Sequence, residues 1–112
     1  MEKKLYEMQA ELCKTLSNPK RLEILDILKE ESEISVNRLA ERLEIPKANT
    51  SQHLAVLRQA GVVTTRKDGI NVYYRLRSVK ISEACSLTRA ILLEKLEDQA
   101  GLTTLIRRDG DS

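Results

Sequence analysis

The spacing of apolar residues in this sequence changes once, near position 60, and that change limits the folds open to the chain. Up to Gln59 the apolar residues recur every three or four positions, which is the period of an amphipathic α-helix. Residues 62–66 are instead β-branched and extended, residues 67–69 carry a hairpin turn signal, and residues 70–76 resemble a return strand. The pattern predicts a mainly α-helical fold with one small β-hairpin.

Five helices are predicted around this hairpin, together with a short strand at Ile34. Asn18 and Ser35 are side chains suited to cap the second and third helices, and Pro46 suits the start of the fourth. Gly61 lies just past the fourth helix, where a left-handed residue is expected. The five helices are expected over residues 3–16, 19–30, 36–43, 46–59 and 79–99.

The composition narrows the class of protein. The chain has 112 residues and contains neither Trp nor Phe, so its core must be built from Leu, Ile, Val and Ala, which suits packed helices. No apolar run reaches the roughly 20 residues that a membrane span needs, and no secretory signal follows the N-terminus. Two cysteines are too few for a disulfide scaffold. We expect a cytoplasmic protein with one domain over residues 1–100 and a tail over residues 101–112.

Charge is concentrated in the middle of the chain. The segment from Val36 to Arg77 has eight basic and three acidic residues, a net charge of +5, whereas the remainder has eleven basic and fourteen acidic residues, a net charge of −3. A basic centre indicates a polyanionic partner for that part of the chain. The simpler alternative is a solvated charged surface, and composition alone does not decide between them.

Two short helices joined by a three-residue turn and followed by a hairpin predict a winged helix-turn-helix. The DNA major groove is about 12 Å wide and admits one helix, so the helix after Pro46 is the predicted reading helix. Its residues expected to contact base edges are Lys47, Asn49, Ser51 and Gln52, and those expected near the DNA backbone are Thr50 and His53. The wing residues expected to contact DNA are Arg66, Lys67 and Asn71.

Each of these residues alone is typical of an ordinary helix or hairpin surface, and only their combination favours DNA. His53 is expected to pack at a helix junction or to touch a phosphate rather than to bind a metal. The alternative function is a winged-helix protein-interaction module that binds no DNA. Such a module would place apolar or acidic residues on the exposed side of the reading helix. An enzyme is not expected, because the chain shows no paired carboxylates beside a base, glycine-rich phosphate loop or Cys–His arrangement.

Several stretches resemble the ArsR/SmtB family of bacterial and archaeal repressors, and the resemblance covers roughly residues 8–98. The most specific stretch is residues 51–63, and the others are residues 22–25, 39–40, Gly69 and residues 73–76. The resemblance implies a homodimer that packs through the first and last helices, binds double-stranded DNA at an imperfect palindrome, and is released when an inducer is sensed.

The family's common metal-sensing patterns are missing from this sequence. Residues 36–43 contain no Cys for a thiol pair, and the last helix contains no His for a zinc site, so no metal site or cofactor is expected. Cys13 and Cys85 remain as candidate sensing thiols. They could form a disulfide or polysulfide bridge. They could instead hold a thiophilic metalloid, and this alternative is not favoured. A third alternative is that both are small buried hydrophobic residues.

Overall fold

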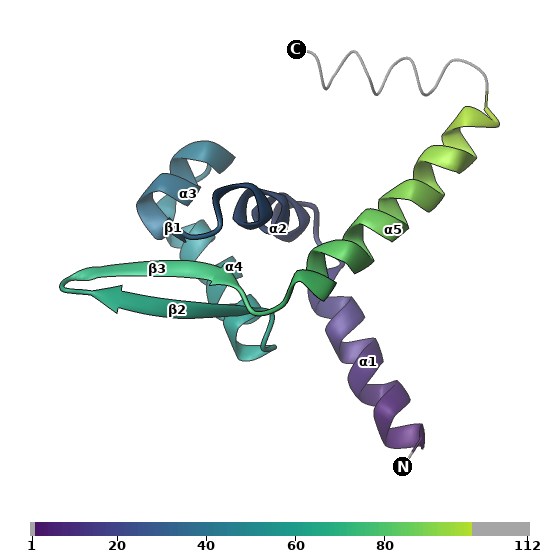
Figure 1. Ribbon diagram of the computed structural model, residues 1–112, viewed down its shortest axis with the longest axis horizontal. Helices are drawn as coiled ribbons and strands as arrows, with labels where there is room; N and C mark the ends of the chain where they lie inside the picture. Colours follow the sequence, from purple (N-terminus) through teal and green to yellow (C-terminus); the bar gives the residue numbers. More distant parts are fainter. Residues whose placement is uncertain (1, 100–112) are drawn as a thin grey trace. The chain divides into compact units, whose positions relative to one another are not determined.

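The computed structural model describes residues 2–99, which group into one unit up to Ser82 and a second unit from Glu83 onward. The predicted tail over residues 101–112 lies outside the described residues, so the division into a domain and a tail stays a prediction. The elements in chain order are α1 (Glu2–Leu16), α2 (Pro19–Glu31), β1 (Ile34–Ser35), α3 (Val36–Leu43), α4 (Lys47–Gln59), β2 (Val63–Asp68), β3 (Asn71–Leu76) and α5 (Val79–Glu97) (Figure 1).

The helix starts follow from local capping. The Asn18 side chain accepts a hydrogen bond from the backbone N–H of Arg21 at 3.1 Å, and the Ser35 hydroxyl accepts one from the backbone N–H of Arg38 at 3.3 Å. These bonds satisfy amide groups that have no partner within the first turn of a helix. Pro46 occupies the cap position of α4 without a side-chain bond, so the helix begins at Lys47, one residue later than predicted.

The turn between α3 and α4 spans residues 44–46 and completes a helix-turn-helix. Glu44 has a left-handed backbone, with φ of 56°. This conformation lets the backbone N–H of Glu44 donate to the carbonyl of Glu41 at 3.2 Å, and that of Ile45 donate to the carbonyl of Ala40 at 3.3 Å. The bonds end α3 in the way that left-handed caps commonly end helices.

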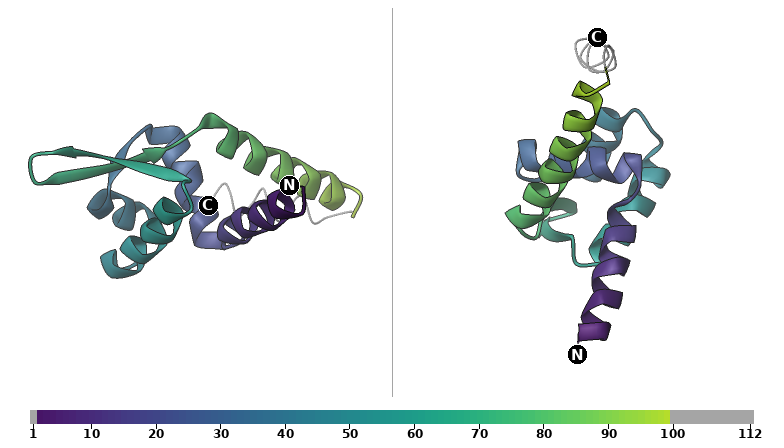
Figure 2. Two further views of the ribbon diagram at one scale, coloured as in Figure 1. Left: turned by 90° about the horizontal axis from the view of Figure 1, so that it is seen from below. Right: turned by 90° about the vertical axis from the view of Figure 1, so that its right-hand side faces the viewer.

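The three strands form an antiparallel sheet in the order β1-β3-β2. The hairpin of β2 and β3 projects beyond α3 and α4 (Figures 1 and 2). Its ladder closes at the pair Asp68 and Asn71, so the turn consists of Gly69 and Ile70. The predicted turn at residues 67–69 and strand from residue 70 are therefore wrong by one to two residues. Gly69 has a φ of 65°, which suits the first position of a type II′ turn.

The core lies among α2, α3, α4 and the bases of the strands. Most of the Leu, Ile and Val side chains of these elements are almost wholly buried, as the composition predicts. The described elements confirm the predicted winged helix-turn-helix fold of five helices with a small sheet. No helix within residues 2–99 is both long and apolar enough to cross a membrane. The largest fully buried apolar side chains are Ile24, Leu25, Leu28, Leu39, Leu54, Leu57, Val62 and Val63.

Candidate nucleic-acid interface

The first turns of α4 present four polar side chains to solvent. Lys47, Asn49, Ser51 and Gln52 are all exposed. Within residues 2–99 none of the four makes a side-chain hydrogen bond or ion pair, so their donors and acceptors are available to a ligand. They lie at the helix N-terminus, where unsatisfied amide groups and the helix dipole favour an anion such as a phosphate.

Thr50 corrects one prediction for this helix, because it is fully buried and its side chain cannot reach DNA. Its hydroxyl donates to the carbonyl of Pro46 at 3.1 Å. The residue points to the same side as Leu54 and Leu57, which follow it at positions i+4 and i+7 of the helix. Its spacing from these two leucines predicts a buried position, whereas its polar side chain favours the surface.

His53 lies at a junction of three helices. It is half-buried, and its Nδ1 accepts a hydrogen bond from Arg21 Nε of α2 at 3.4 Å. Arg21 also donates through Nη1 to the carbonyl of Thr15 at the end of α1, at 3.0 Å. Burial and, secondarily, the positive charge of Arg21 lower the pKa of His53 below its usual value. No group of three or more potential metal ligands occurs in the part of the chain that the structure describes.

The wing carries the three residues predicted to contact DNA, but they are in different environments. Lys67 and Asn71 are exposed near the turn, and neither has a side-chain partner among the described residues. Arg66 instead pairs with Glu33, which lies between α2 and β1. Its guanidinium also lies over the ring of Tyr73, 4.9 Å from the centroid. No local pattern in the sequence predicts the pairing with Glu33, because the two residues are 33 positions apart.

Acidic residues at the end of α2 neutralise two further cations of the basic middle segment. Arg42 contacts Glu30 and Glu31 at 3.2 Å each, and Arg38 approaches Glu31 at 3.8 Å. These acids precede the segment that has a net charge of +5, so the count along the sequence overestimates the positive charge that α3 offers to a ligand. Lys47 and Lys67 keep no carboxylate partner among residues 2–99.

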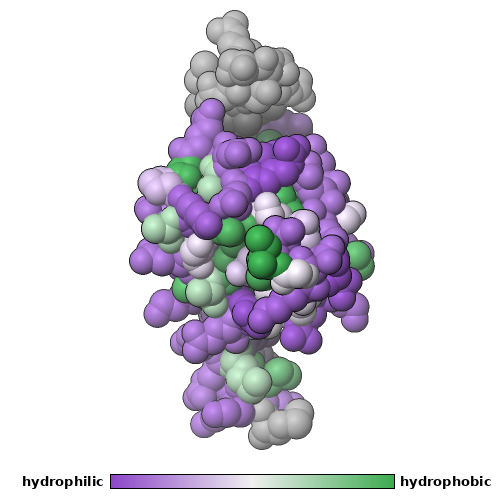
Figure 3. All heavy atoms as spheres, turned by 90° about the vertical axis from the view of Figure 1, so that its left-hand side faces the viewer, coloured by the Kyte–Doolittle hydropathy of each residue, from purple (hydrophilic) through white to green (hydrophobic). Residues whose placement is uncertain are grey.

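Figure 3 views the end of the molecule where the wing has its turn. Hydrophilic residues cover most of this face, with a small hydrophobic patch near its centre. One hydrophobic residue of the turn, Ile70, is 98% exposed. A face that is mainly polar suits a polar, charged ligand better than an apolar protein surface.

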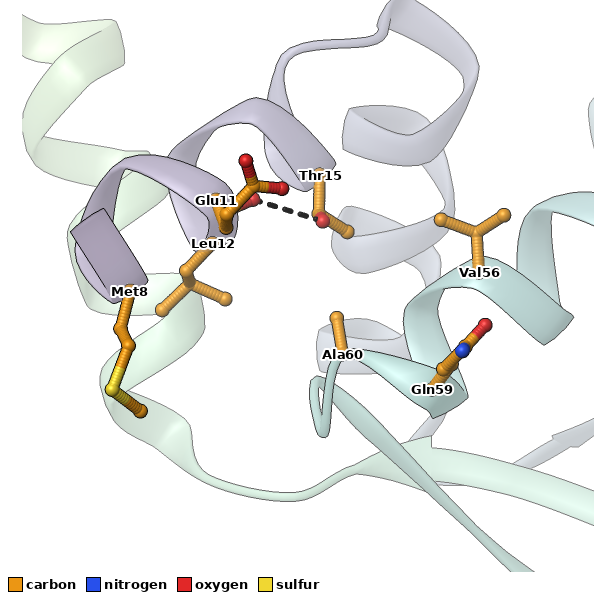
Figure 4. Close-up of a pocket in the computed structure, with 7 residues that line it drawn as sticks. All are labelled: Met8, Glu11, Leu12, Thr15, Val56, Gln59 and Ala60. Atoms are coloured by element: carbon orange, nitrogen blue, oxygen red, sulfur yellow. Dashed lines mark hydrogen bonds between the residues drawn. The ribbon is translucent and has the colours of Figure 1, made fainter. Parts of the chain in front are cut away.

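A second feature of the first unit is an apolar groove of about 400 Å³ between α1 and α4. Leu12 and Ala60 face the space between the two helices (Figure 4). Met8 and Val56 also line the groove and are 60% and 37% exposed. α1 buries none of its residues, so its apolar stripe has no cover within the first unit.

The cysteines lie on the two terminal helices. Cys13 of α1 is exposed, Cys85 of α5 is half-buried, and neither is in a disulfide. The interpretation of both as buried hydrophobic residues therefore does not hold for a single chain. In the second unit, α5 leaves Leu87, Ile91 and Leu92 exposed.

The chain is similar to proteins of known class. Residues 16–66 match the model of a helix-turn-helix domain. The HTH-type transcriptional regulator Rv0081 of Mycobacterium tuberculosis is 34% identical over 108 residues, which cover 96% of this chain and 95% of that protein. Its crystal structure superposes with a TM-score of 0.78 at 38% identity, over 87% of this chain and 97% of that one.

Two other relatives have the same fold. The transcriptional activator HlyU of Vibrio cholerae is 42% identical over 68% of this chain and 69% of its own length, and its structure gives a TM-score of 0.69 over 81% of this chain and 97% of that one. The homodimeric winged helix-turn-helix DNA-binding domain of Mb0332 from Mycobacterium bovis, a possible ArsR-family regulator, gives a TM-score of 0.78 at 28% identity over 88% of this chain and 90% of that one. These relatives are regulators of transcription, which confirms the prediction of a regulator rather than an enzyme.

Proposed function

Because the chain belongs to the ArsR/SmtB family of winged helix-turn-helix transcriptional regulators, which bind DNA, we propose that it is a homodimeric repressor of a pseudo-palindromic operator. The observation that carries the proposal is the exposed polar face at the start of α4. Lys47, Asn49, Ser51 and Gln52 read base edges in the major groove, and Lys67 and Asn71 of the wing contact the backbone. His53 lies beside this face and holds α4 against α2.

The proposal includes a two-fold dimer, supported by apolar surface that a single chain leaves uncovered. The stripe of α1 and the groove beside it, together with the exposed apolar residues of α5, offer contacts to a second copy. The structure of Mb0332 is homodimeric, which supports the same assembly here. A two-fold axis places two reading helices about one DNA turn, roughly 34 Å, apart.

Fluorescence anisotropy tests the DNA-binding proposal directly. The probe is a duplex from the region upstream of the protein's own gene, and the comparison is an unrelated duplex of the same length. We expect tighter binding to the upstream duplex, with affinity that falls steeply with salt. Absence of binding to either duplex in dilute buffer would contradict the proposal and favour a protein-interaction module.

A substitution of Gln52 tests the reading role of α4. Gln52→Ala is expected to relax discrimination at one base pair by about 1–3 kcal/mol, because a direct contact to a base edge is lost. Gln99→Ala is the matched control, since Gln99 is also exposed but lies beyond the end of α5. Equal weakening of all duplexes by Gln52→Ala would show that the residue does not read a base.

We further propose that Cys13 and Cys85 mediate release from DNA. Both thiols are at least partly accessible in the single chain, and each lies on a helix that the proposed dimer uses. A gel shift is run with reduced protein, then after diamide or polysulfide, and then with arsenite or zinc. We expect oxidation or persulfidation to release the DNA, and Cys85→Ser to prevent the release. Release by arsenite alone would favour a thiolate metalloid site, and no response to any treatment would exclude a sensing role.

A further inference from the structure

Glu33 occupies a position that joins the helical part of the fold to the wing. It follows α2 and directly precedes β1, whose residues Ile34 and Ser35 pair with Tyr74 and Tyr73 of β3. Its carboxylate thus lies beside the face of the hairpin from which Arg66 extends. Although 33 residues separate Glu33 from Arg66 in the sequence, the sheet brings the two side chains together.

The contact between Glu33 and Arg66 is bidentate. Arg66 Nη2 donates to Glu33 Oε1 at 2.6 Å, and Arg66 Nε donates to Oε2 at 3.2 Å. Tyr73 is the cross-strand partner of Arg66, and its ring packs against the guanidinium. Two parallel bonds and a stacked ring fix the orientation of this cation. The hydrogen bond from Arg66, with additional attraction from Arg66 and Arg75, lowers the pKa of Glu33, so the carboxylate stays ionised at neutral pH.

Lys67 provides the contrast, because it is the next residue along the strand and has no such partner among the described residues. Alternate residues of a strand point to opposite faces, so Arg66 and Lys67 extend from opposite sides of the hairpin. A DNA phosphate that approached Arg66 would have to displace two charge-assisted bonds and would meet the negative charge of Glu33. A phosphate that approached Lys67 would meet neither obstacle.

We propose that Glu33 is a positioning residue for DNA binding, which holds Arg66 on the protein so that Arg66 supports the wing without neutralising a phosphate. Phosphate neutralisation at the wing then falls to Lys67. This inference rests on the proposed binding of DNA, and it reverses the role that the sequence predicts for Arg66.

The salt dependence of affinity tests this inference, because each neutralised phosphate contributes about −0.9 to the slope of log K against log salt. We expect Arg66→Gln to leave the slope of the full-length protein unchanged and Lys67→Gln to make it shallower by about 0.9. These two variants are matched, since each removes one cation from adjacent positions of β2. Glu33→Gln is expected to steepen the slope by about 0.9, because the long side chain of Arg66, once released, can reach around the edge of the hairpin to a phosphate.

Three further variants separate a local effect from a change in total charge. Glu7→Gln on α1 removes a carboxylate as Glu33→Gln does and is expected to leave the slope unchanged. Glu33→Asp keeps the carboxylate and should restore the wild-type slope, and the double variant Glu33→Gln with Arg66→Gln should also return to it. Circular dichroism confirms that each variant is folded.

Two outcomes would overturn the inference. A slope made shallower by Arg66→Gln would identify Arg66 as a phosphate ligand. An unchanged slope in Glu33→Gln would show that the carboxylate does not hold Arg66 away from DNA. Either result is distinct from a failure of the proposed function, in which the wild-type protein itself would not bind the duplex.

Discussion

The two N-terminal helices both carry apolar residues at helical spacing, but these residues lie in opposite environments. In α2, Ile24, Leu25 and Leu28 are at most 1% exposed, whereas in α1 Met8 is 60% and Leu12 is 40% exposed. The difference shows that apolar residues at helical spacing predict an apolar face on a helix, but they do not predict which surface covers that face. α2 is covered by other elements of its own chain, whereas the apolar face of α1 has no cover within the first unit. Substitutions in the two helices and in the core between them should therefore differ in their effects.

The largest effect is expected from truncation inside the covered region. Leu54→Ala removes a side chain of α4 that is fully buried. The lost burial and the resulting cavity should lower the free energy of unfolding by about 2–5 kcal/mol. Urea unfolding followed by circular dichroism measures this loss. A loss below about 1 kcal/mol would mean that the region does not form a tightly packed core.

The second prediction concerns the uncovered face. Leu12→Asp on α1 should weaken self-association by tenfold or more, about 1.4 kcal/mol, because a charge is placed in an apolar contact between copies. Sedimentation velocity over a range of concentrations measures the change, with Glu7→Gln as the control on the same helix. If Leu12→Asp lowers the free energy of unfolding as much as Leu54→Ala does, α1 belongs to the core of the monomer and the comparison fails.

A smaller effect is expected where the two helices meet. Asn18→Ala removes the side-chain acceptor that caps α2 and should cost about 1 kcal/mol of stability. Asn18→Asp keeps an acceptor at the same position and should retain most of that stability. Thermal unfolding of both variants provides the measurement, and equal losses in the two would show that the cap bond contributes nothing.

The smallest effect concerns pH and the contact between His53 and Arg21. Burial and Arg21 lower the pKa of His53 in the folded chain, so the unfolded chain takes up a proton first as the pH falls. Stability is therefore expected to be intact above about pH 7.5 and to fall below the ordinary histidine pKa of roughly 6.5. We expect the melting temperature of His53→Gln to fall less than that of the wild type between pH 8 and pH 5, because the variant has no group at this position whose pKa is lowered by folding. Parallel pH curves for the two proteins would contradict this assignment.

The sequence predicts the helices and strands but not the contacts between residues far apart along the chain. The bounds of α3 were predicted correctly, because the apolar spacing and the cap at Ser35 act within a few residues. The prediction for Thr50 is wrong, because its polar side chain favours the exposed side of α4 whereas its spacing from Leu54 places it on the buried side. The role of Glu33 could not be predicted, since its contact with Arg66 depends on how the sheet folds back on the helices.

The two-residue strand β1 has a consequence for how the protein could be switched. Ser35 pairs with Tyr73 of the wing and also caps α3 through the backbone N–H of Arg38. Ser35 therefore links the wing to the first turn of α3, and a shift of the hairpin is expected to displace that turn with it. In the proposed dimer, an inducer would then change DNA affinity by altering the separation of the two reading helices relative to the helical repeat of the duplex, while the link between the wing and α3 is kept in each protomer.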